Sequence, residues 1–183
     1  MSVEIVPGFR LIERWRDMSV EDALCGIVWE QPTLRIFGRE VLAPRLTAWF
    51  GTGAYTYAGK RHEPSPMPEW VDAARLDIER MTGATFNSVL LNYYRDGRDS
   101  VSWHADDEPE LGDEPTIASW SIGAYRTFAM RANSDARTSW RTLLGGGDLL
   151  IMSGRSQLDY QHSVPKTTRP IGPRINPTFR MVK

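Results

Sequence analysis

The second half of the chain is a succession of short apolar segments of strand length, separated by polar or glycine-containing turns. These segments span residues 88–93, 117–122, 127–131, 139–144, 148–152, 161–164 and 174–181. Short strands at regular spacing are typical of a closed or double-sheet β architecture, in which each strand finds neighbours and a buried face. The spacing therefore predicts a mainly β fold of the jelly-roll type over residues 86–183.

Two helices are predicted in the first half. Ser19, followed by Glu21 and Asp22, is typical of a helix start, because a serine side chain caps the first turn and acidic groups favour its N-terminus. A second helix is expected over residues 69–81, after two prolines, and ends at Gly83. With 183 residues and 41% apolar side chains, the chain is expected to be one domain. Residues 1–85 would then cover the core formed by residues 86–183.

A candidate metal site is carried by histidine and aspartate. His104 and Asp106 lie two residues apart on a segment expected to be extended, so their side chains point to the same side. The chain has three histidines, and His162 lies in a second strand-like segment. Two imidazoles and one carboxylate on one face of a metal, with the other positions open, are typical of non-haem Fe(II) oxygenases. A histidine in either position, taken alone, is more often a hydrogen-bonded structural residue than a metal ligand.

A polar face on the last predicted strand favours the metal interpretation. Arg174, Asn176, Thr178 and Arg180 alternate along the segment RINPTFR and therefore share one face. Two guanidinium groups buried without partners would cost free energy. A guanidinium matches a carboxylate through two parallel hydrogen bonds, so a small dicarboxylic keto acid would satisfy both arginines.

With these residues in view, the chain resembles the AlkB family of Fe(II)- and 2-oxoglutarate-dependent nucleic-acid dealkylases. The motifs that carry the resemblance follow in family order: NYYRDG, SWHADDEPELG, ASWSIGAYRTFAMR, GDLLIMSG, QHSVPK and RINPTFR. PRLTAWFG, YTY and FNSVLLN add a likeness to the eukaryotic-type DNA and RNA repair homologues. The resemblance implies a double-stranded β-helix (jelly-roll) dioxygenase core with flanking helices, and an N-terminal lid that faces the substrate.

The resemblance also implies roles for individual residues. The Fe(II) ligands, which form the catalytic centre, would be His104, Asp106 and His162, with 2-oxoglutarate and O2 as cosubstrates. The residues implied to hold 2-oxoglutarate are Asn92, Tyr94, Arg174, Asn176, Thr178 and Arg180. Those implied to face the substrate are Tyr55, Tyr57, Glu108, Phe37 and Arg131.

The implied reaction is oxidative demethylation of bases such as 1-methyladenine and 3-methylcytosine, with release of formaldehyde, succinate and CO2. The expected partner is alkylated single-stranded DNA or RNA, because an N-methyl group on the pairing edge is reached only in an unpaired or flipped base. Duplex DNA stays open as a substrate. Phe37 stands where duplex-active members of the family insert an aromatic side chain into the base stack.

Charge is distributed unevenly along the chain, although the net charge is −1. Residues 96–114 carry eight acidic and one basic side chain, whereas residues 115–183 carry three acidic and ten basic ones. The basic part could contact phosphates, and binding would then depend on salt. The candidates for such contacts are Arg126, Arg131, Arg137, Arg141, Arg155, Lys166 and Arg169.

The sequence also indicates a location and an assembly. One cysteine, Cys25, excludes an internal disulfide and favours a reducing cytoplasm. No signal peptide is recognised. No apolar run approaches the roughly 20 residues of a membrane span, so no membrane partner is expected. A monomer is expected.

Three other functions fit part of the pattern. A dioxygenase of the same fold could act on a protein or small-molecule substrate, and a nucleic-acid binding module could have lost its catalysis. A zinc hydrolase could use the same three ligands, but it would leave Arg174 and Arg180 without a purpose. One residue departs from the family motif: Pro177 stands where an aliphatic residue is usual, which predicts that the last strand lies at a sheet edge or is locally irregular.

Overall fold

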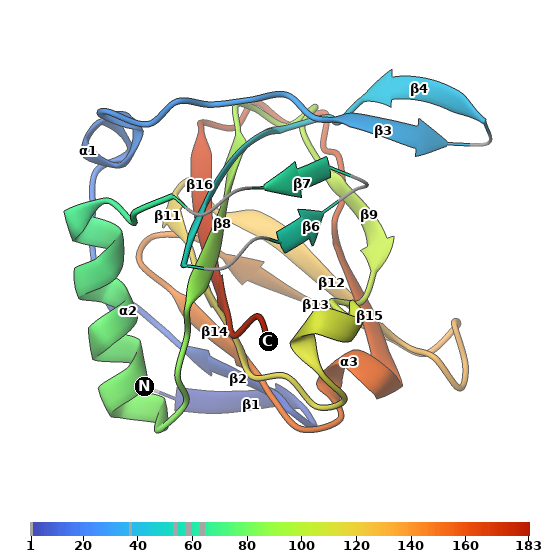
Figure 1. The fold of residues 1–183 in the computed structure, drawn as a ribbon. Coiled ribbons are helices and arrows are strands. Elements are labelled where there is room, and N and C mark those ends of the chain that lie inside the picture. Colours follow the sequence, from blue (N-terminus) through green and yellow to red (C-terminus); the bar gives the residue numbers. More distant parts are fainter. Residues whose placement is uncertain (1, 37, 53–54, 58–59, 63–64) are drawn as a thin grey trace.

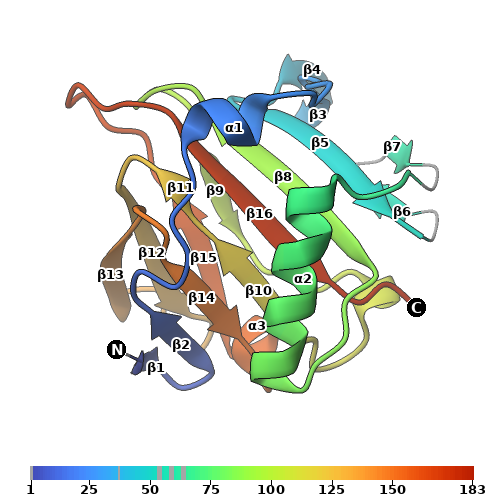
Figure 2. The same ribbon diagram turned by 90° about the vertical axis from the view of Figure 1, so that its left-hand side faces the viewer.

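The computed structural model describes residues 2–36, 38–52, 55–57, 60–62 and 65–183. Two antiparallel sheets enclose the core, which confirms the jelly-roll architecture expected from the strand spacing (Figure 1, Figure 2). The larger sheet has the order β1 (Ser2–Val6), β2 (Phe9–Ile12), β14 (Leu149–Met152), β10 (Ile117–Trp120), β16 (Arg174–Arg180), β8 (Ser88–Tyr94) and β5 (Leu46–Gly51), and the short β11 (Ile122–Gly123) also pairs with β16. The smaller sheet has the order β13 (Ser139–Leu144), β12 (Arg126–Ala132), β15 (Tyr160–Val164) and β9 (Val101–His104).

Both predicted helices are present, with the ends that the sequence indicates. In α1 (Val20–Leu24), the Ser19 side chain accepts a hydrogen bond from the Asp22 backbone N–H at 3.0 Å. The longer α2 (Glu69–Thr82) ends at Gly83, whose φ of 72° lies in the left-handed region that glycine adopts without steric cost. Two further short turns of helix are η1 (Pro109–Leu111) and α3 (Ser156–Asp159). No helix in the described ranges is long and apolar enough to cross a membrane.

Helix α2 covers the outer face of the larger sheet and thereby decides which side chains point inward (Figure 2). Its buried side chains belong to the same cluster as alternate residues of β8 and β16, among them Leu91 and Phe179. Side chains alternate between the two faces of a strand. The residues between them, such as Asn92 and Arg180, therefore point to the inner face, into the space between the two sheets.

Two small hairpins from the N-terminal part lie outside the sheets. They are formed by β3 (Thr33–Ile36) with β4 (Arg39–Leu42) and by β6 (Tyr55–Tyr57) with β7 (Lys60–His62) (Figure 1). Gly51 and Ser65 close the root of the second hairpin by two backbone hydrogen bonds of 2.9 and 3.0 Å. The hairpins come from the part of the chain that was expected to cover the core.

The N-terminal hairpin β1–β2 is an extension of the larger sheet that the sequence pattern did not predict. β2 pairs with β14 over four residues, from Leu149 opposite Ile12 to Met152 opposite Phe9. Phe9 and Leu11 are buried in the core as a result. The mixed charged and apolar composition of the first residues gave no sign of this pairing, because the partner strand lies at the other end of the chain.

Strand β16 lies in the middle of the larger sheet, so the expected edge position for Pro177 is wrong. The β8 side is paired without a gap, from Tyr94 opposite Arg174 to Ser88 opposite Arg180. The other side is interrupted between β10 and β11, whose unchanged register puts Trp120 opposite Pro177.

The local irregularity expected from Pro177 is therefore confirmed on one side of the strand. Pro177 has no N–H to donate, and the ladder breaks where that donor is missing. The Trp120 carbonyl accepts a hydrogen bond from Asn176 Nδ2 at 2.6 Å instead. One side-chain amide thus replaces the backbone donor that the proline lacks.

Candidate metal centre

The structure brings His104, Asp106 and His162 together at the inner face of the smaller sheet. His104 is the last residue of β9, and in the β9–β15 pair it stands directly opposite His162, with ring centroids 4.3 Å apart. Asp106 follows two residues later. One potential ligand atom from each of the three residues lies within 4.8 Å of the other two. The expected group of two imidazoles and one carboxylate is therefore formed.

The three ligands are held by different contacts. His104 Nδ1 lies 2.9 Å from the Ser102 carbonyl, to which it donates, so that Nε2 is left to face Asp106 Oδ1 at 3.8 Å. The Asp106 backbone N–H donates to Gln157 Oε1 at 3.0 Å. Fixing the second nitrogen of a histidine in this way orients the other nitrogen for a metal.

His162 is buried against Phe128, and their rings are stacked with centroids 5.3 Å apart. Its Nδ1 has no hydrogen-bond partner among the residues that the structure describes. The interpretation of His162 as a hydrogen-bonded structural residue therefore finds no support at this nitrogen. His104, with 31% of its side chain exposed, forms the open side of the group.

Electrostatics favour the protonation states that a cation needs. Burial alone would raise the pKa of the Asp106 carboxyl, but the positive charge of Arg180 and the two neighbouring histidines outweigh it and lower that pKa to about 2. Burial lowers the pKa of His162 to about 3, and His104 acts in the same direction. A neutral imidazole and an ionised carboxylate are the forms that bind a metal. The donor set of two nitrogens and one carboxylate fits Fe(II).

The polar face of β16 reaches the same place. Arg180 Nη2 donates to Asp106 Oδ2 at 2.9 Å, which links the arginine motif to the metal ligands. In the β8–β16 pair, Asn176 stands opposite Asn92 and Arg174 opposite Tyr94. A cavity of about 40 Å³ adjoins the three ligands and is lined by five of the predicted cosubstrate residues: Asn92, Tyr94, Asn176, Thr178 and Arg180. That volume holds a few water molecules.

Arg174 lies behind this cavity rather than in its wall. It is 1% exposed, its guanidinium lies over the Tyr94 ring at 5.3 Å, and its Nη2 donates to Ser121 Oγ at 2.8 Å. Its Nε and Nη1 are buried without a hydrogen-bond partner among the described residues. Burial lowers the pKa of Arg174 to about 10, which leaves it positively charged at neutral pH. Unsatisfied donors on a buried cation fit a carboxylate ligand.

Arg45 and Gln157 are site residues that sequence reasoning missed. Arg45 is buried in the wall of the cavity and donates from Nε to Asn92 Oδ1 at 2.8 Å. It stands in PRLTAWFG, one of the segments that carry the resemblance, and a basic residue within that segment was the available signal. Gln157 follows the GDLLIMSG motif, and nothing in its local sequence predicts its contact with the Asp106 backbone.

The predicted substrate residues are only partly placed by the structure. Phe37 lies outside the described residues, and Tyr55 and Tyr57 belong to β6, of which only the backbone is described. Glu108 is half-buried two residues after Asp106, whereas Asp107 between them is exposed, as expected from alternation.

Arg131 lies away from the metal ligands. Its neighbour Met130 stands opposite His162, so the Arg131 side chain points to the outer face of the smaller sheet. There its guanidinium lies over the Trp103 ring at 4.6 Å and donates from Nε to Gln161 at 3.0 Å.

The prediction that Arg126 belongs to a phosphate-contacting surface is wrong. Arg126 is 2% exposed. It donates to the carbonyl oxygens of Asp96, Asp99 and Pro165 at 3.0, 2.7 and 2.9 Å. A cation in this position serves the interior of the protein, because it lies too deep to meet a nucleic-acid backbone.

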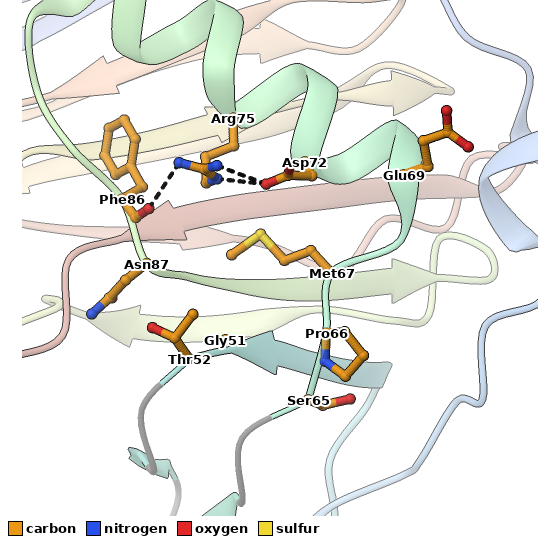
Figure 3. Close-up of a pocket in the computed structure, with 10 residues that line it drawn as sticks. All are labelled: Gly51, Thr52, Ser65, Pro66, Met67, Glu69, Asp72, Arg75, Phe86 and Asn87. Atoms are coloured by element: carbon orange, nitrogen blue, oxygen red, sulfur yellow. Dashed lines mark hydrogen bonds and ion pairs between the residues drawn. The ribbon is translucent and has the colours of Figure 1, made fainter.

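A separate cavity of about 750 Å³ lies between α2 and the ends of β5 and β8 (Figure 3). Arg75 crosses this region and pairs with Asp72 at 2.8 Å and Glu79 at 2.9 Å. It also donates to the Phe86 carbonyl. None of the predicted site residues lines this cavity, so its larger volume does not mark the metal centre.

Comparison with known proteins agrees with this geometry. The sequence pattern of the 2OG-Fe(II) oxygenase superfamily matches residues 3–180. The chain is 44% identical over 192 residues to the Alpha-ketoglutarate-dependent dioxygenase alkB homolog 3 of Mus musculus, covering 97% of this chain and 65% of that protein. It is 37% identical over 187 residues to the DNA oxidative demethylase ALKBH2 of Arabidopsis thaliana, covering 85% and 59%.

The likeness to AlkB homologues predicted from the motifs is thus confirmed, although this chain spans less than two thirds of the length of either relative. A solved structure of OsALKBH1 matches with a TM-score of 0.65 at 16% identity, covering 99% of this chain and 100% of that one, which shows a shared fold. From the match over residues 3–180 and the formed metal centre, we conclude that the chain belongs to the 2OG-Fe(II) oxygenase superfamily.

Proposed function

We propose that this protein is an Fe(II)- and 2-oxoglutarate-dependent dioxygenase that demethylates N-alkylated bases in DNA or RNA. The observation that carries the proposal is the buried contact between Arg180 and Asp106, which joins the arginine strand to the metal ligands in one site. A hydrolytic metal centre would have no use for the guanidinium groups behind it. The relative named DNA oxidative demethylase ALKBH2 supports nucleic acid as the substrate class.

Different residues of the site would bind the metal and the keto acid. His104, Asp106 and His162 would hold Fe(II), which together with 2-oxoglutarate and O2 supplies the oxidation of the N-methyl group. Arg174 would bind the distal carboxylate of the keto acid, since two of its nitrogens are buried without partners among the described residues. Arg180 keeps Asp106 ionised and would place a positive charge beside the other carboxylate of the keto acid.

The remaining cosubstrate contacts come from the facing strands. Asn92, Tyr94, Asn176 and Thr178 would donate to the keto acid from the cavity wall. Once hydroxylated, the methyl group becomes a hemiaminal that releases formaldehyde and restores the base. The keto acid leaves as succinate and CO2.

The substrate side is proposed from charge and geometry. A base methylated at N1 of adenine or N3 of cytosine is cationic, and Glu108, two residues after Asp106, would place a carboxylate near it. The methyl group lies on the pairing edge, so the base must be unpaired or flipped out of a duplex. We propose single-stranded DNA or RNA as the preferred substrate, with Tyr55 and Tyr57 stacking against bases, a contact worth roughly 1–3 kcal/mol per base.

Mass spectrometry of a short single-stranded DNA with one N1-methyladenine tests the proposal. The oligonucleotide is incubated with Fe(II), 2-oxoglutarate and the protein, first without and then with oxygen, beside a His104→Ala control. Loss of one methyl mass that needs oxygen, keto acid and His104 is the expected result. Succinate formation with unchanged DNA would overturn the proposal that nucleic acid is the substrate. It would favour a protein or small-molecule substrate for the same iron centre.

Two matched experiments refine the outcome. Replacing Fe(II) and ascorbate with Zn(II) should abolish turnover, whereas retained activity would favour a zinc hydrolase. The same lesion is then presented in single-stranded RNA and in duplex DNA. Repair should be slower in the duplex than in either single strand, because flipping the base out of the duplex costs free energy.

A further inference from the structure

Arg126 forms hydrogen bonds at the ends of the strands that carry the metal and cosubstrate residues. Its three carbonyl acceptors belong to the turn between β8 and β9 and to the residue that follows β15. β8 carries Tyr94, β9 ends at His104, and β15 carries His162. One buried guanidinium thus contacts the turn that joins β8 to β9 and the end of β15, and these three strands position the site.

The same guanidinium faces Tyr94. It lies over the Tyr94 ring at 5.5 Å, and Arg174 lies over that ring at 5.3 Å. The Tyr94 phenol therefore has two guanidinium groups against it. A cation over an aromatic face is attracted to it, which fixes the ring as well as the cation.

Both cations are 2% exposed or less, and neither is in a salt bridge among those the structure shows for the described residues. Asp96 and Asp99 act electrostatically on Arg126, and Asp148 acts on Arg174. Burial lowers the pKa of each, and the charge of Arg126 adds to the lowering at Arg174. The hydrogen bonds of Arg126 go to neutral carbonyl oxygens. Burying positive charge costs free energy, so this end of the pocket favours an anion.

We propose that Arg126 is a further cationic residue behind the cosubstrate pocket, which acts through Tyr94 and makes the pocket select keto acids that carry a distal carboxylate. This inference rests on the proposed function. Arg174 would contact the carboxylate itself, whereas Arg126 is a positioning residue. It lies over the Tyr94 ring, as Arg174 does, and adds positive potential near the distal carboxylate.

The experiment compares two keto acids on the anaerobic Fe(II)-loaded protein by isothermal titration calorimetry. 2-Oxoglutarate has the distal carboxylate, and 2-oxobutyrate lacks it. Arg126→Gln should weaken 2-oxoglutarate binding on the order of tenfold, the effect of removing one charge from a site of intermediate dielectric constant. It should leave 2-oxobutyrate binding nearly unchanged. Arg126→Lys keeps the charge and should retain most of the preference for 2-oxoglutarate.

A neighbouring arginine supplies the matched control. Arg95 belongs to the same turn and pairs with Asp99 at 2.7 Å, but it is half-exposed and has no contact with Tyr94 among those the structure shows. Arg95→Gln loosens the turn and should leave the ratio of the two dissociation constants as in the wild type. Melting temperatures of the variants, measured in parallel, report any loss of folding.

The outcomes separate this inference from the function beneath it. If Arg126→Gln and Arg126→Lys weaken the binding of both keto acids equally, Arg126 has only a structural role and the inference is overturned. An unchanged affinity of Arg126→Gln for 2-oxoglutarate overturns it as well. If the wild-type protein binds no 2-oxoglutarate, the proposed function fails, and this inference fails with it.

Discussion

Arg180 and Asp106 form a buried ion pair in which Nη2 and Oδ2 are 2.9 Å apart and both side chains are at most 6% exposed. The pair joins the middle strand of the larger sheet to the segment that follows β9 in the smaller one. It is therefore a bond between the two sheets as well as a part of the metal centre.

Replacing Arg180 by leucine should destabilise the metal-free protein by about 3–5 kcal/mol, because Asp106 would remain buried without a compensating charge. A bound divalent cation supplies that charge, so the loss should be smaller when Mn(II) is present. Urea unfolding with EDTA and with Mn(II) measures both values. Equal losses under the two conditions would contradict the explanation, and Asp106→Asn in the same background should reduce the loss.

The stability of the metal-free protein should fall as the pH drops from about 6.5 toward 3. The pKa of His162 is about 3 in the fold, and an exposed histidine titrates near 6.5, so the unfolded chain binds one more proton in this window. The slope should be about 1.4 kcal/mol per pH unit for that proton. Urea unfolding at several pH values measures it, and His162→Gln should remove this part of the slope. A slope that His162→Gln leaves unchanged would assign the proton to another group.

Asn176 and Pro177 should show a compensating double-mutant cycle. Asn176→Ala leaves the buried Trp120 carbonyl without its side-chain donor, which should cost about 1–3 kcal/mol. Adding Pro177→Val restores a backbone N–H opposite Trp120 and should recover part of that loss. Thermal unfolding of the single and double variants gives the coupling energy. If Pro177→Val destabilises both backgrounds to the same extent, the proline is not what makes the amide necessary.

Glu108→Gln should affect cationic lesions more than neutral ones. The carboxylate would be attracted to 1-methyladenine, which is cationic, whereas 1,N6-ethenoadenine is neutral at the same pH. We expect kcat/KM to fall about tenfold for the cationic lesion, a loss of roughly 1.4 kcal/mol, and to change little for the neutral one. Competition between two oligonucleotides in one reaction measures the ratio directly. An equal loss on both lesions would show that Glu108 acts through folding or positioning.

Local patterns in the sequence predicted the local features of the fold. Ser19 and Gly83 bound their helices as expected, because each acts on the backbone next to it. Alternation in RINPTFR predicted which side chains of β16 share the inner face. His104 and His162 could be assigned to the same site because the chain has few histidines. Two histidines with Asp106 also form a donor set that is typical of a metal centre.

Features that depend on distant partners were missed or misjudged. Pro177 predicted an edge strand or a local irregularity, and only the irregularity is found, since nothing near it reveals that β10 and β8 lie on either side. Arg126 was interpreted as a surface residue because its charge is visible in the sequence and its three carbonyl acceptors are not. Arg45 was not predicted as a site residue because its partner is not visible in the local sequence. Asn92 is brought to it only by the pairing of β5 with β8.

The direct pairing of His162 with His104 has a consequence for how the protein is made. During synthesis, the ribosome releases β9 long before β15 and β16, which carry His162 and the arginine motif. An emerging chain therefore carries His104 and Asp106 without His162, the third member of the group. The group of three is complete only when β15 pairs with β9, so a chain cut short before Tyr160 lacks one of the three potential ligands.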